Sequence, residues 1–270
     1  MDLFEADTPQ AIGTGDIVLS DALDLLRSLE AGSVATIVAD PPYGIAYHSN
    51  HYQEKNPHAP IAQDWNVNIG SFLSAAERVL RDGAAIYLFT RWDVYPIWAK
   101  EVPPSLSLKN LIVWDKGNWS SGDLTGNFGF QHEVIMFLVK GRHTIRGKRW
   151  PNIWAVPRIS HTKLRMPAEK PLEMYERAII ASSDAGDLVV DTFGGSGTLA
   201  EAAARNGRRF LVGDVDKKMV RMARQRVGLP VTEDSEETRI VSVCPVFNVT
   251  PPCPSLWGLH PEDLADWRAR

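Results

Sequence analysis

The sequence predicts an α/β protein with a doubly wound, mainly parallel sheet, the architecture called Rossmann-like. Short apolar runs rich in branched residues, such as 34–39 and 188–191, alternate with amphipathic stretches of helical length. A glycine-rich turn at 191–198 joins one of these runs to the next helical stretch. Strands that alternate with helices in this way pair in parallel, because each helix carries the chain back across the sheet.

In the first half of the chain, Ser20 or Asp21 is suited to cap the first helix, because either side chain accepts a backbone N–H. The elements expected there are a strand at 16–20, a helix at 21–29, a strand at 34–39, a helix at 71–80 ended by Gly83, and a strand at 84–89. No internal repeat is visible in the sequence.

In the second half, Pro171 fits the start of a helix, where its missing N–H costs nothing. The elements expected there are a helix around 94–100, strands at 111–114 and 134–139, a helix at 171–182, a strand at 188–191, a helix towards Asn206 and a strand at 209–214. After Gly228 the sequence becomes Pro-rich and acidic, so we expect one domain at 1–227 and an appendage at 228–270.

Composition favours a cytoplasmic protein. The start of the chain lacks the basic and apolar regions of a signal peptide, and no apolar run approaches the ~20 residues that span a bilayer. Cys244 and Cys253 form no C-x-x-C motif, and we expect both to be reduced. Three histidines in the polar loop 44–66 fit no compact ligand set, so we expect no metal.

The charge is distributed unevenly, although the formal net charge is only -4. Between Val134 and Ala168 there are eight basic residues and no Asp or Glu. Aromatic side chains such as Trp150 and Trp154 are interleaved with them, and nucleic-acid bases stack on such side chains. The segment is interpreted as an anion-binding face on which nucleic-acid bases could stack, and a merely solvated charge run is the alternative.

The turn Asp40-Pro41-Pro42-Tyr43 follows the apolar run 34–39. Two prolines have no N–H to donate, so the strand must stop there. The rigid turn then presents a carboxylate, a carbonyl and an aromatic ring. These groups suit a flat heterocycle with an exocyclic NH₂, and a plain strand-ending turn with a surface Tyr is the alternative.

The turn Asp191–Ala200 leads from a strand into a helix N-terminus, where free N–H groups and close backbone approach favour a nucleotide-like ligand. Asp214 ends the next strand, 19 residues after Gly195. This is the distance along the chain at which an acidic residue binds the ribose hydroxyls in nucleotide-binding folds. Gly195-x-Gly197-x-x-Ala200 also satisfies the dinucleotide pattern, so an NAD-linked oxidoreductase is a competing interpretation. Asp191 would repel a pyrophosphate but would suit the cationic amino-acid end of S-adenosylmethionine.

Together these motifs resemble the β-class amino-methyltransferases of DNA, in which D-P-P-Y precedes the glycine motif. The resemblance covers roughly residues 15–227. It extends to residues 17–22, Asp64-Trp65, Gln131-His132-Glu133 and the P-x-x-K-P segment 167–171. Met166 stands where the family commonly has His, and only about 30 residues separate the H-E strand from P-x-x-K-P, where the family usually inserts a target-recognition region.

The resemblance implies a class I methyltransferase fold and S-adenosyl-L-methionine as cofactor. It implies catalytic roles for Asp40, Pro41, Pro42 and Tyr43. The cofactor residues implied are Asp21, Ala22, Asp40, Lys170, Asp191, Phe193, Gly194, Gly195, Ser196, Gly197, Thr198 and Asp214. Contacts with double-stranded DNA are expected from loops at about 44–66, 116–130 and 140–165, with Arg142, Arg146, Lys148, Arg149, Arg158, Lys163 and Arg165 as the cations.

The expected reaction is methyl transfer to adenine N6, whose lone pair is delocalised into the ring. Asp40 and the Pro41 carbonyl would each accept one N–H and make the nitrogen more tetrahedral, which favours the transition state. Tyr43 would stack on a base flipped out of the duplex. Cytosine N4 is the first alternative, and an RNA or protein substrate or a non-catalytic DNA-binding module are further ones. A homodimer and a cognate restriction endonuclease are expected by resemblance.

Overall fold

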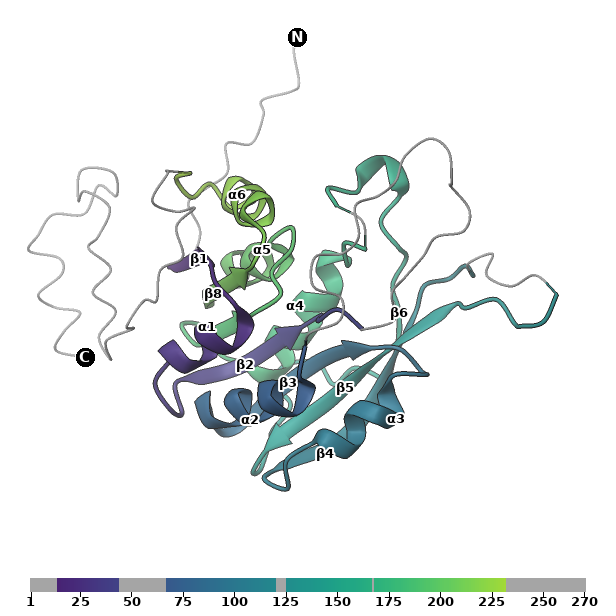
Figure 1. Ribbon diagram of the computed structural model, residues 1–270, viewed down its shortest axis with the longest axis horizontal. Helices are drawn as coiled ribbons and strands as arrows, with labels where there is room; N and C mark the ends of the chain where they lie inside the picture. Colours follow the sequence, from purple (N-terminus) through teal and green to yellow (C-terminus); the bar gives the residue numbers. More distant parts are fainter. Residues whose placement is uncertain (1–13, 44–66, 120–124, 167, 232–270) are drawn as a thin grey trace, which may run out of the picture.

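The computed structural model describes residues 14–43, 67–119, 125–166 and 168–231. It contains one eight-stranded sheet covered by helices (Figure 1). The expected loop 44–66, with Asp64 and Trp65, lies outside the described residues, and so does the part of the expected appendage beyond Val231. Among the helices of the described part, none has both the length and the apolar character needed to cross a membrane.

The sheet is mainly parallel, as the sequence predicted. Its order is β1-β8-β7-β2-β3-β5-β4-β6, and β5 runs antiparallel to both β3 and β4 while the other pairings are parallel. The strands are β1 (Gly15–Leu19), β2 (Val34–Ala39), β3 (Leu80–Thr90), β4 (Leu106–Asp115), β5 (His132–Lys140), β6 (Ile153–Ala155), β7 (Leu188–Asp191) and β8 (Arg209–Asp214).

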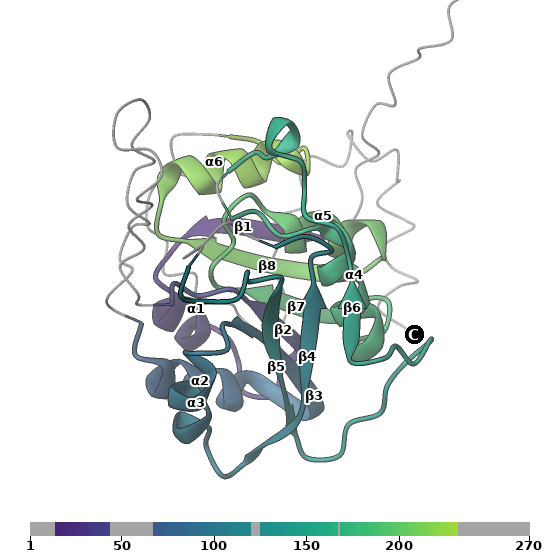
Figure 2. The ribbon, with the colours of Figure 1, turned by 90° about the vertical axis from the view of Figure 1, so that its right-hand side faces the viewer.

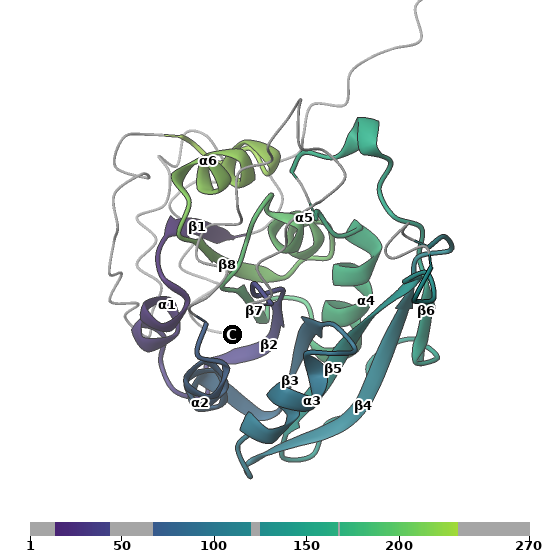
Figure 3. The ribbon, with the colours of Figure 1, turned by 45° about the vertical axis from the view of Figure 1, so that its right-hand side comes forward.

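Helices cover both faces of this sheet, which confirms the doubly wound prediction. They are α1 (Ala22–Ser28), α2 (Ile69–Val79), α3 (Tyr95–Trp98), α4 (Leu172–Ser182), α5 (Thr198–Arg205) and α6 (Lys217–Arg226), with short 3₁₀ turns η1 (Ala99–Glu101) and η2 (His161–Lys163). One buried cluster joins α4, α5 and α6 to the sheet, and a second joins α1, α2 and α3 to the opposite face. Figure 3 shows α1 and α2 on one side of the strands and α4 and α5 on the other.

Local sequence explains most of these elements. Val38 and Ile37 alternate between the two buried clusters, as strand periodicity requires when both faces are covered. Asp21, and not Ser20, caps α1 by accepting the Leu23 N–H at 2.8 Å. Asn68 caps α2 in the same way.

Three local expectations were wrong or incomplete. Gly83 does not end a helix: α2 stops at Val79, and Gly83 lies inside β3 with φ +76°, close to a register shift in the β2–β3 pairing. Strand β6 and helix α6 were not anticipated. β6 has only three residues within a basic segment, and it forms because β4 offers a free edge beside α4 (Figure 2).

The topology creates a crevice between β7 and β2. From β7 the chain passes through α5 to β8 on one side, whereas from β2 it passes through α2 to β3 on the other. Where the strand order reverses in this way, ligands bind outside the carboxyl ends of the strands. Asp191 ends β7 and Asp40 follows β2, so both predicted acidic turns lie at this crevice.

Candidate active site

The Asp40 carboxylate is held by two donors on its two oxygens. Lys170 Nζ lies 2.6 Å from Oδ2, and the Tyr43 hydroxyl donates to Oδ1 at 2.8 Å. The Lys170 side chain is only 6 % exposed, so this ion pair is shielded from water. A carboxylate has about four acceptor positions, and two of them stay available for a further N–H donor.

Glu133 and Lys116 complete a network of two acids and two ammonium groups. Glu133 Oε2 lies 3.4 Å from Lys170 Nζ and Oε1 lies 3.0 Å from Lys116 Nζ. Burial alone would raise the pKa of Glu133, but the two lysines outweigh it and lower that pKa. Burial alone would lower the pKa of Lys170, but Asp40 and Glu133 raise it, so Lys170 stays charged. The four charges sum to zero.

Tyr43 is fixed beside Asp40 by ring contacts as well as by its hydroxyl. Its ring meets Trp98 edge-on at a centroid distance of 6.0 Å, and Lys170 Nζ lies 5.9 Å from its centre. Burial, with the nearby Asp40 and Glu133 charges, raises the pKa of Tyr43, so the hydroxyl remains a donor. Pro41 is buried and Pro42 half-buried in the same turn.

Asp191 is fully buried and only half satisfied. Its Oδ1 accepts the Phe193 N–H at 2.9 Å, whereas Oδ2 has no hydrogen-bond partner among the described residues. Burial raises the pKa of this carboxyl well above its usual value, and the Phe193 N–H only partly offsets that shift. An unpaired buried carboxylate oxygen is costly, so it favours a cationic ligand.

The three glycines of the turn 194–197 have little room for a side chain. A Cβ on Gly194 would lie 2.2 Å from a methyl carbon of Val212, and one on Gly197 would lie 2.9 Å from the Ala223 Cα. Gly197 also has φ +78°, which L-residues rarely adopt. Met166 packs against Gly195, since a Cβ there would lie 2.9 Å from its sulfur. The turn packs closely on β8 and α6, with Gly194 and Gly197 buried and Gly195 partly exposed.

Asp214 closes the other side of the turn. Its Oδ2 accepts the Gly195 N–H at 2.8 Å and its Oδ1 accepts the Asp216 N–H at 2.8 Å. Burial raises the pKa of Asp214, and these backbone donors partly counter it. Asp21 lies on the neighbouring strand end, because the Ser20 N–H donates to the Asp214 carbonyl, and Ala22 is buried behind it.

Arg226 organises the site and was missed from the sequence. Its guanidinium is 4 % exposed and binds Glu169 at 2.9 Å, the Glu201 carboxylate, and the Ser196 and Thr198 hydroxyls at 2.9 and 3.0 Å. It therefore ties α6 to the glycine turn and to the residue before Lys170. Nothing in the spacing of these residues along the chain indicated that they meet. Tyr175 was also missed. It is buried, and its burial together with the charges of Asp191 and Asp40 raises its pKa.

The structure divides the basic segment between the two ends of the strands. Because β5 is antiparallel, Lys140 lies beside the start of β3, and the residues after it lie far from Asp40. There His143 contacts the Gly83 carbonyl at 2.7 Å and Arg146 pairs with Asp184 at 2.8 Å. The seven predicted DNA-contacting cations thus do not form one face. Arg142 and Arg146 lie at the amino ends of the parallel strands, and Lys148 and Arg149 follow beside α4. The other three cations, Arg158, Lys163 and Arg165, lie at the carboxyl ends of these strands.

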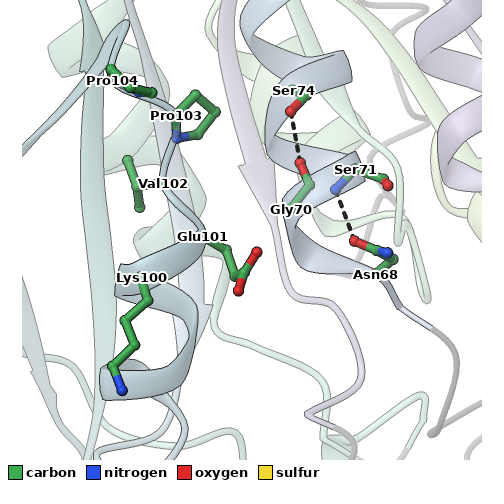
Figure 4. A pocket seen from close by; sticks show the side chains of 9 residues that line it. All are labelled: Asn68, Gly70, Ser71, Ser74, Lys100, Glu101, Val102, Pro103 and Pro104. Atoms are coloured by element: carbon green, nitrogen blue, oxygen red, sulfur yellow. Dashed lines mark hydrogen bonds between the residues drawn. The ribbon is translucent and has the colours of Figure 1, made fainter.

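An open pocket of about 700 Å³ lies apart from the two acidic turns, between the start of α2 and the residues after α3 (Figure 4). It is lined by Asn68, Gly70, Ser71, Ser74, Lys100, Glu101, Val102, Pro103 and Pro104. None of these residues carries a predicted role, and neither Asp40 nor Asp191 belongs to the lining. No group of His, Cys, Asp or Glu in the described part of the chain is arranged to hold a metal.

The fold and the crevice define a Rossmann-like protein with a glycine turn and two flanking carboxylates. Comparison with known proteins identifies the family to which the chain belongs. Residues 34–225 match the family model described as DNA methylase, so the chain belongs to the DNA methylase family. This confirms the resemblance inferred from D-P-P-Y and the glycine motif, and it leaves no basis for the NAD-linked interpretation.

Individual relatives agree with the family. The DNA adenine methyltransferase YhdJ of Escherichia coli is 26% identical over 255 residues, covering 82% of this chain and 85% of that protein. The type II methyltransferase M.HpaI of Haemophilus parainfluenzae is 24% identical over 242 residues, covering 78% of this chain and 73% of that protein.

Two solved structures share the fold. The M1.HpyAVI–SAM complex has a TM-score of 0.59 at 18% identity, covering 79% of this chain and 100% of that one. The cytosine-N4-specific PvuII DNA methyltransferase has a TM-score of 0.61 at 16% identity, covering 85% of this chain and 92% of that one.

Proposed function

We propose that this DNA methylase transfers a methyl group from S-adenosyl-L-methionine to the N6 amino group of adenine in double-stranded DNA. One observation carries the proposal. Two carboxylates of opposite character, Asp40 and Asp191, meet at the crevice of the sheet, one held in a D-P-P-Y turn and the other buried with a free oxygen. The relative YhdJ is named an adenine methyltransferase, which favours adenine over cytosine N4.

The residues present fit S-adenosylmethionine. The free Oδ2 of Asp191 suits a primary ammonium group, and Gly194, Gly195 and Gly197 carry no side chain that would block close backbone contact. Asp214 keeps an acceptor position for a hydroxyl group, because a carboxylate has about four such positions and backbone N–H groups such as those of Gly195 and Asp216 occupy only some of them. Phe193 packs between the turn and Phe72, with ring centres 5.5 Å apart, and provides an apolar wall. The cofactor supplies an electrophilic methyl group.

Asp40 and the Pro41 carbonyl act on the amine that receives the methyl group. Each accepts one N–H and draws the nitrogen towards tetrahedral geometry, so that its lone pair is freed from the ring. The nitrogen would become positive as its bond to the methyl group forms and the bond from that methyl group to the sulfonium breaks, so the interaction with Asp40 would strengthen in the transition state. A neutral thioether would leave, and loss of one N–H proton to water would restore the neutral amine. The Tyr43 ring offers a stacking surface for the base, which must leave the duplex to reach this turn.

Lys170 holds Asp40 in position in this scheme. We assign it to the carboxylate and not to the cofactor, because its ammonium group lies 2.6 Å from Asp40 and 3.4 Å from Glu133. Glu133 and Lys116 keep the group of four neutral, so that Lys170 does not repel the positive charge that develops on the amine. Arg158, Lys163 and Arg165 are proposed to bind phosphates, since they lie at the edge of the sheet that carries Asp40.

The deciding experiment is nucleoside mass spectrometry after incubation with S-adenosylmethionine and unmethylated genomic DNA, with Asp40→Ala as the matched inactive control. N6-methyladenine formed by the wild type but not by the variant is the expected result. N4-methylcytosine would keep the proposed chemistry and replace adenine by cytosine. Absence of any methylated base, with the cofactor shown to bind, would reject DNA as the substrate under these conditions. A homodimer and a paired restriction endonuclease stay predictions, which sedimentation and genomic context test.

A further inference from the structure

Four aromatic side chains lie beyond the carboxyl ends of β3 and β4 and the amino end of the antiparallel β5. Trp92 follows β3 and is 52 % exposed, Trp119 follows β4 and is 69 % exposed, and Phe128, shortly before β5, is 92 % exposed. Phe130 stacks on Trp92 with ring centres 6.4 Å apart and planes 21° apart. These residues, Trp92, Trp119, Phe128 and Phe130, are called the aromatic cluster below. Large exposed apolar groups that gather in one place mark an interaction surface.

Trp119, Phe128 and Phe130 lie on the two arms of one connection, from β4 to β5, and these arms lie against each other. A Cβ on Gly129 would lie 2.4 Å from the Trp119 ring, so that ring rests on the glycine backbone. The Lys116 N–H donates to the Gln131 carbonyl at 3.1 Å, and Gln131 Nε2 donates to Asp115 at 2.8 Å. The described arms of this connection project from the sheet (Figure 1).

Residues close to the cluster in sequence belong to the charged network around Asp40. Phe130 stands three residues before Glu133, whose carboxylate contacts the Lys170 ammonium, and Lys170 in turn contacts Asp40. Lys116 lies three residues before Trp119 and binds the same Glu133. The aromatic cluster therefore lies at the same end of the strands as the turn proposed to receive the target base.

The chemistry of the surface favours nucleobases over a second protein. In the described parts of this connection, 116–119 and 125–130, every large apolar side chain is aromatic. A cation accompanies them, since Arg158 Nε donates to the Asn118 side chain at 3.1 Å beside Trp119. Exposed rings for bases and a cation for phosphate together define a surface for unpaired DNA, because every base has a face that can stack.

We propose that the aromatic cluster stacks on an unpaired nucleobase of the DNA substrate, next to the base that enters the Asp40 site. The inference rests on the proposed function, as it concerns the DNA of that reaction. Extrusion of one base leaves its partner and its neighbours without a stacking surface, and the exposed rings at 92, 119, 128 and 130 replace that surface. The cluster would thus stabilise the opened duplex.

The test measures binding of two labelled oligomers of equal length by fluorescence anisotropy. One is a single-stranded oligodeoxynucleotide, and the other is an oligomer of abasic units with the same phosphates. Trp92→Ala should weaken binding to the base-containing strand about 5- to 150-fold, the loss expected for one stacked base, and should leave the abasic oligomer within about twofold. The dependence of affinity on salt should be unchanged, because no phosphate contact is removed. Trp92→Phe should keep most of the affinity.

Leu108→Ala is the matched control, since Leu108 is also an exposed apolar side chain but lies near the amino end of β4, opposite Leu138. Equal losses on both oligomers, or no loss with Trp92→Ala when the wild type binds, would overturn the inference. So would a shift from dimer to monomer in sedimentation, which would assign the surface to a second copy of the chain. A wild type that neither methylates nor binds DNA would reject the proposed function itself, and a parallel methylation assay separates that case.

Discussion

Asp40 and Asp191 occupy equivalent places, at the carboxyl ends of adjacent parallel strands, but they are treated in opposite ways. Asp40 receives a proton donor on each oxygen, from Lys170 at 2.6 Å and Tyr43 at 2.8 Å. Asp191 receives one backbone N–H, and its second oxygen has no partner among the described residues. The charge of Asp40 is balanced within the protein, whereas the charge of Asp191 is not.

The difference separates a positioned group from a binding group. A carboxylate that must hold an amine in one orientation benefits from fixed partners, because little reorganisation is then needed in the transition state. A carboxylate that must attract a cationic ligand benefits from an oxygen that has no hydrogen-bond donor in the protein, because the ligand then supplies that donor. The same residue type therefore serves two tasks, and its hydrogen-bond partners decide which.

The largest effect is expected from Asp40→Ala. Turnover should fall by at least about 10²–10³-fold, the loss typical for one group that stabilises the developing charge. Affinity for S-adenosylmethionine, measured by titration calorimetry, should stay near the wild-type value because Asp191 and the glycine turn are unchanged. Turnover close to that of the wild type would refute the role of Asp40.

Asp191→Asn should act on binding instead. The Kd for S-adenosylmethionine should rise about 10- to 150-fold, since a hydrogen bond to a charged group contributes about 1.5–3 kcal/mol. The cofactor-free variant should be more stable to unfolding at neutral pH, by roughly 1–3 kcal/mol, because an unpaired buried carboxylate is removed. Thermal unfolding of the cofactor-free wild type and variant checks the expected gain in stability, which is opposite in sign to the loss of affinity. A variant that binds the cofactor as tightly as the wild type would contradict the assignment of Asp191 as the binding carboxylate.

The pH dependence of cofactor affinity sharpens the same point. Burial raises the pKa of Asp191, so the carboxyl takes up a proton at a higher pH in the folded protein than in the unfolded chain. Affinity for the cationic ligand should therefore weaken up to tenfold per pH unit as pH falls through that raised pKa. The cofactor-free fold should instead gain stability over the same range. Asp191→Asn should flatten both profiles, and a wild-type profile as flat as the variant's would contradict the assignment.

Tyr43→Phe should have the smallest effect. It keeps the ring but removes the hydroxyl that donates to Asp40, and one hydrogen bond is worth about 1 kcal/mol, or roughly fivefold in turnover. Tyr43→Ala removes the stacking surface too and should cost more, since stacking contributes about 1–3 kcal/mol per base. Steady-state kinetics on one DNA substrate ranks the pair, and equal rates for the two variants would exclude a role for the ring.

Local sequence was enough for the parts of the site that each element carries by itself. The apolar run before Asp40 and the prolines after it fixed where β2 ends, and the glycines fixed the turn after β7. Steric limits and periodicity act over a few residues, so these features were predictable. Strand β6 was not, because three residues have no period of their own and depend on the free edge of β4.

The expected anion-binding face shows the limit most clearly. The sequence places Arg142 and Arg158 in one basic segment, but β5 is antiparallel and delivers Arg142 to the edge opposite Asp40. Proximity along the chain then says little about proximity in space. The direction of a central strand is decided by which neighbours it pairs with, and that depends on the whole sheet.

The sequence by itself therefore determined the doubly wound fold, the two acidic turns and the family. Only the tertiary structure decided how the charge of each acidic turn is balanced. Lys170, Glu133 and Lys116 form a charged network around Asp40, whereas none of these three groups pairs with Asp191. It also brought Arg226 onto the glycine turn. Charge balance in a buried site depends on groups far apart in the chain, because electrostatic energy follows distance in space and not separation in sequence.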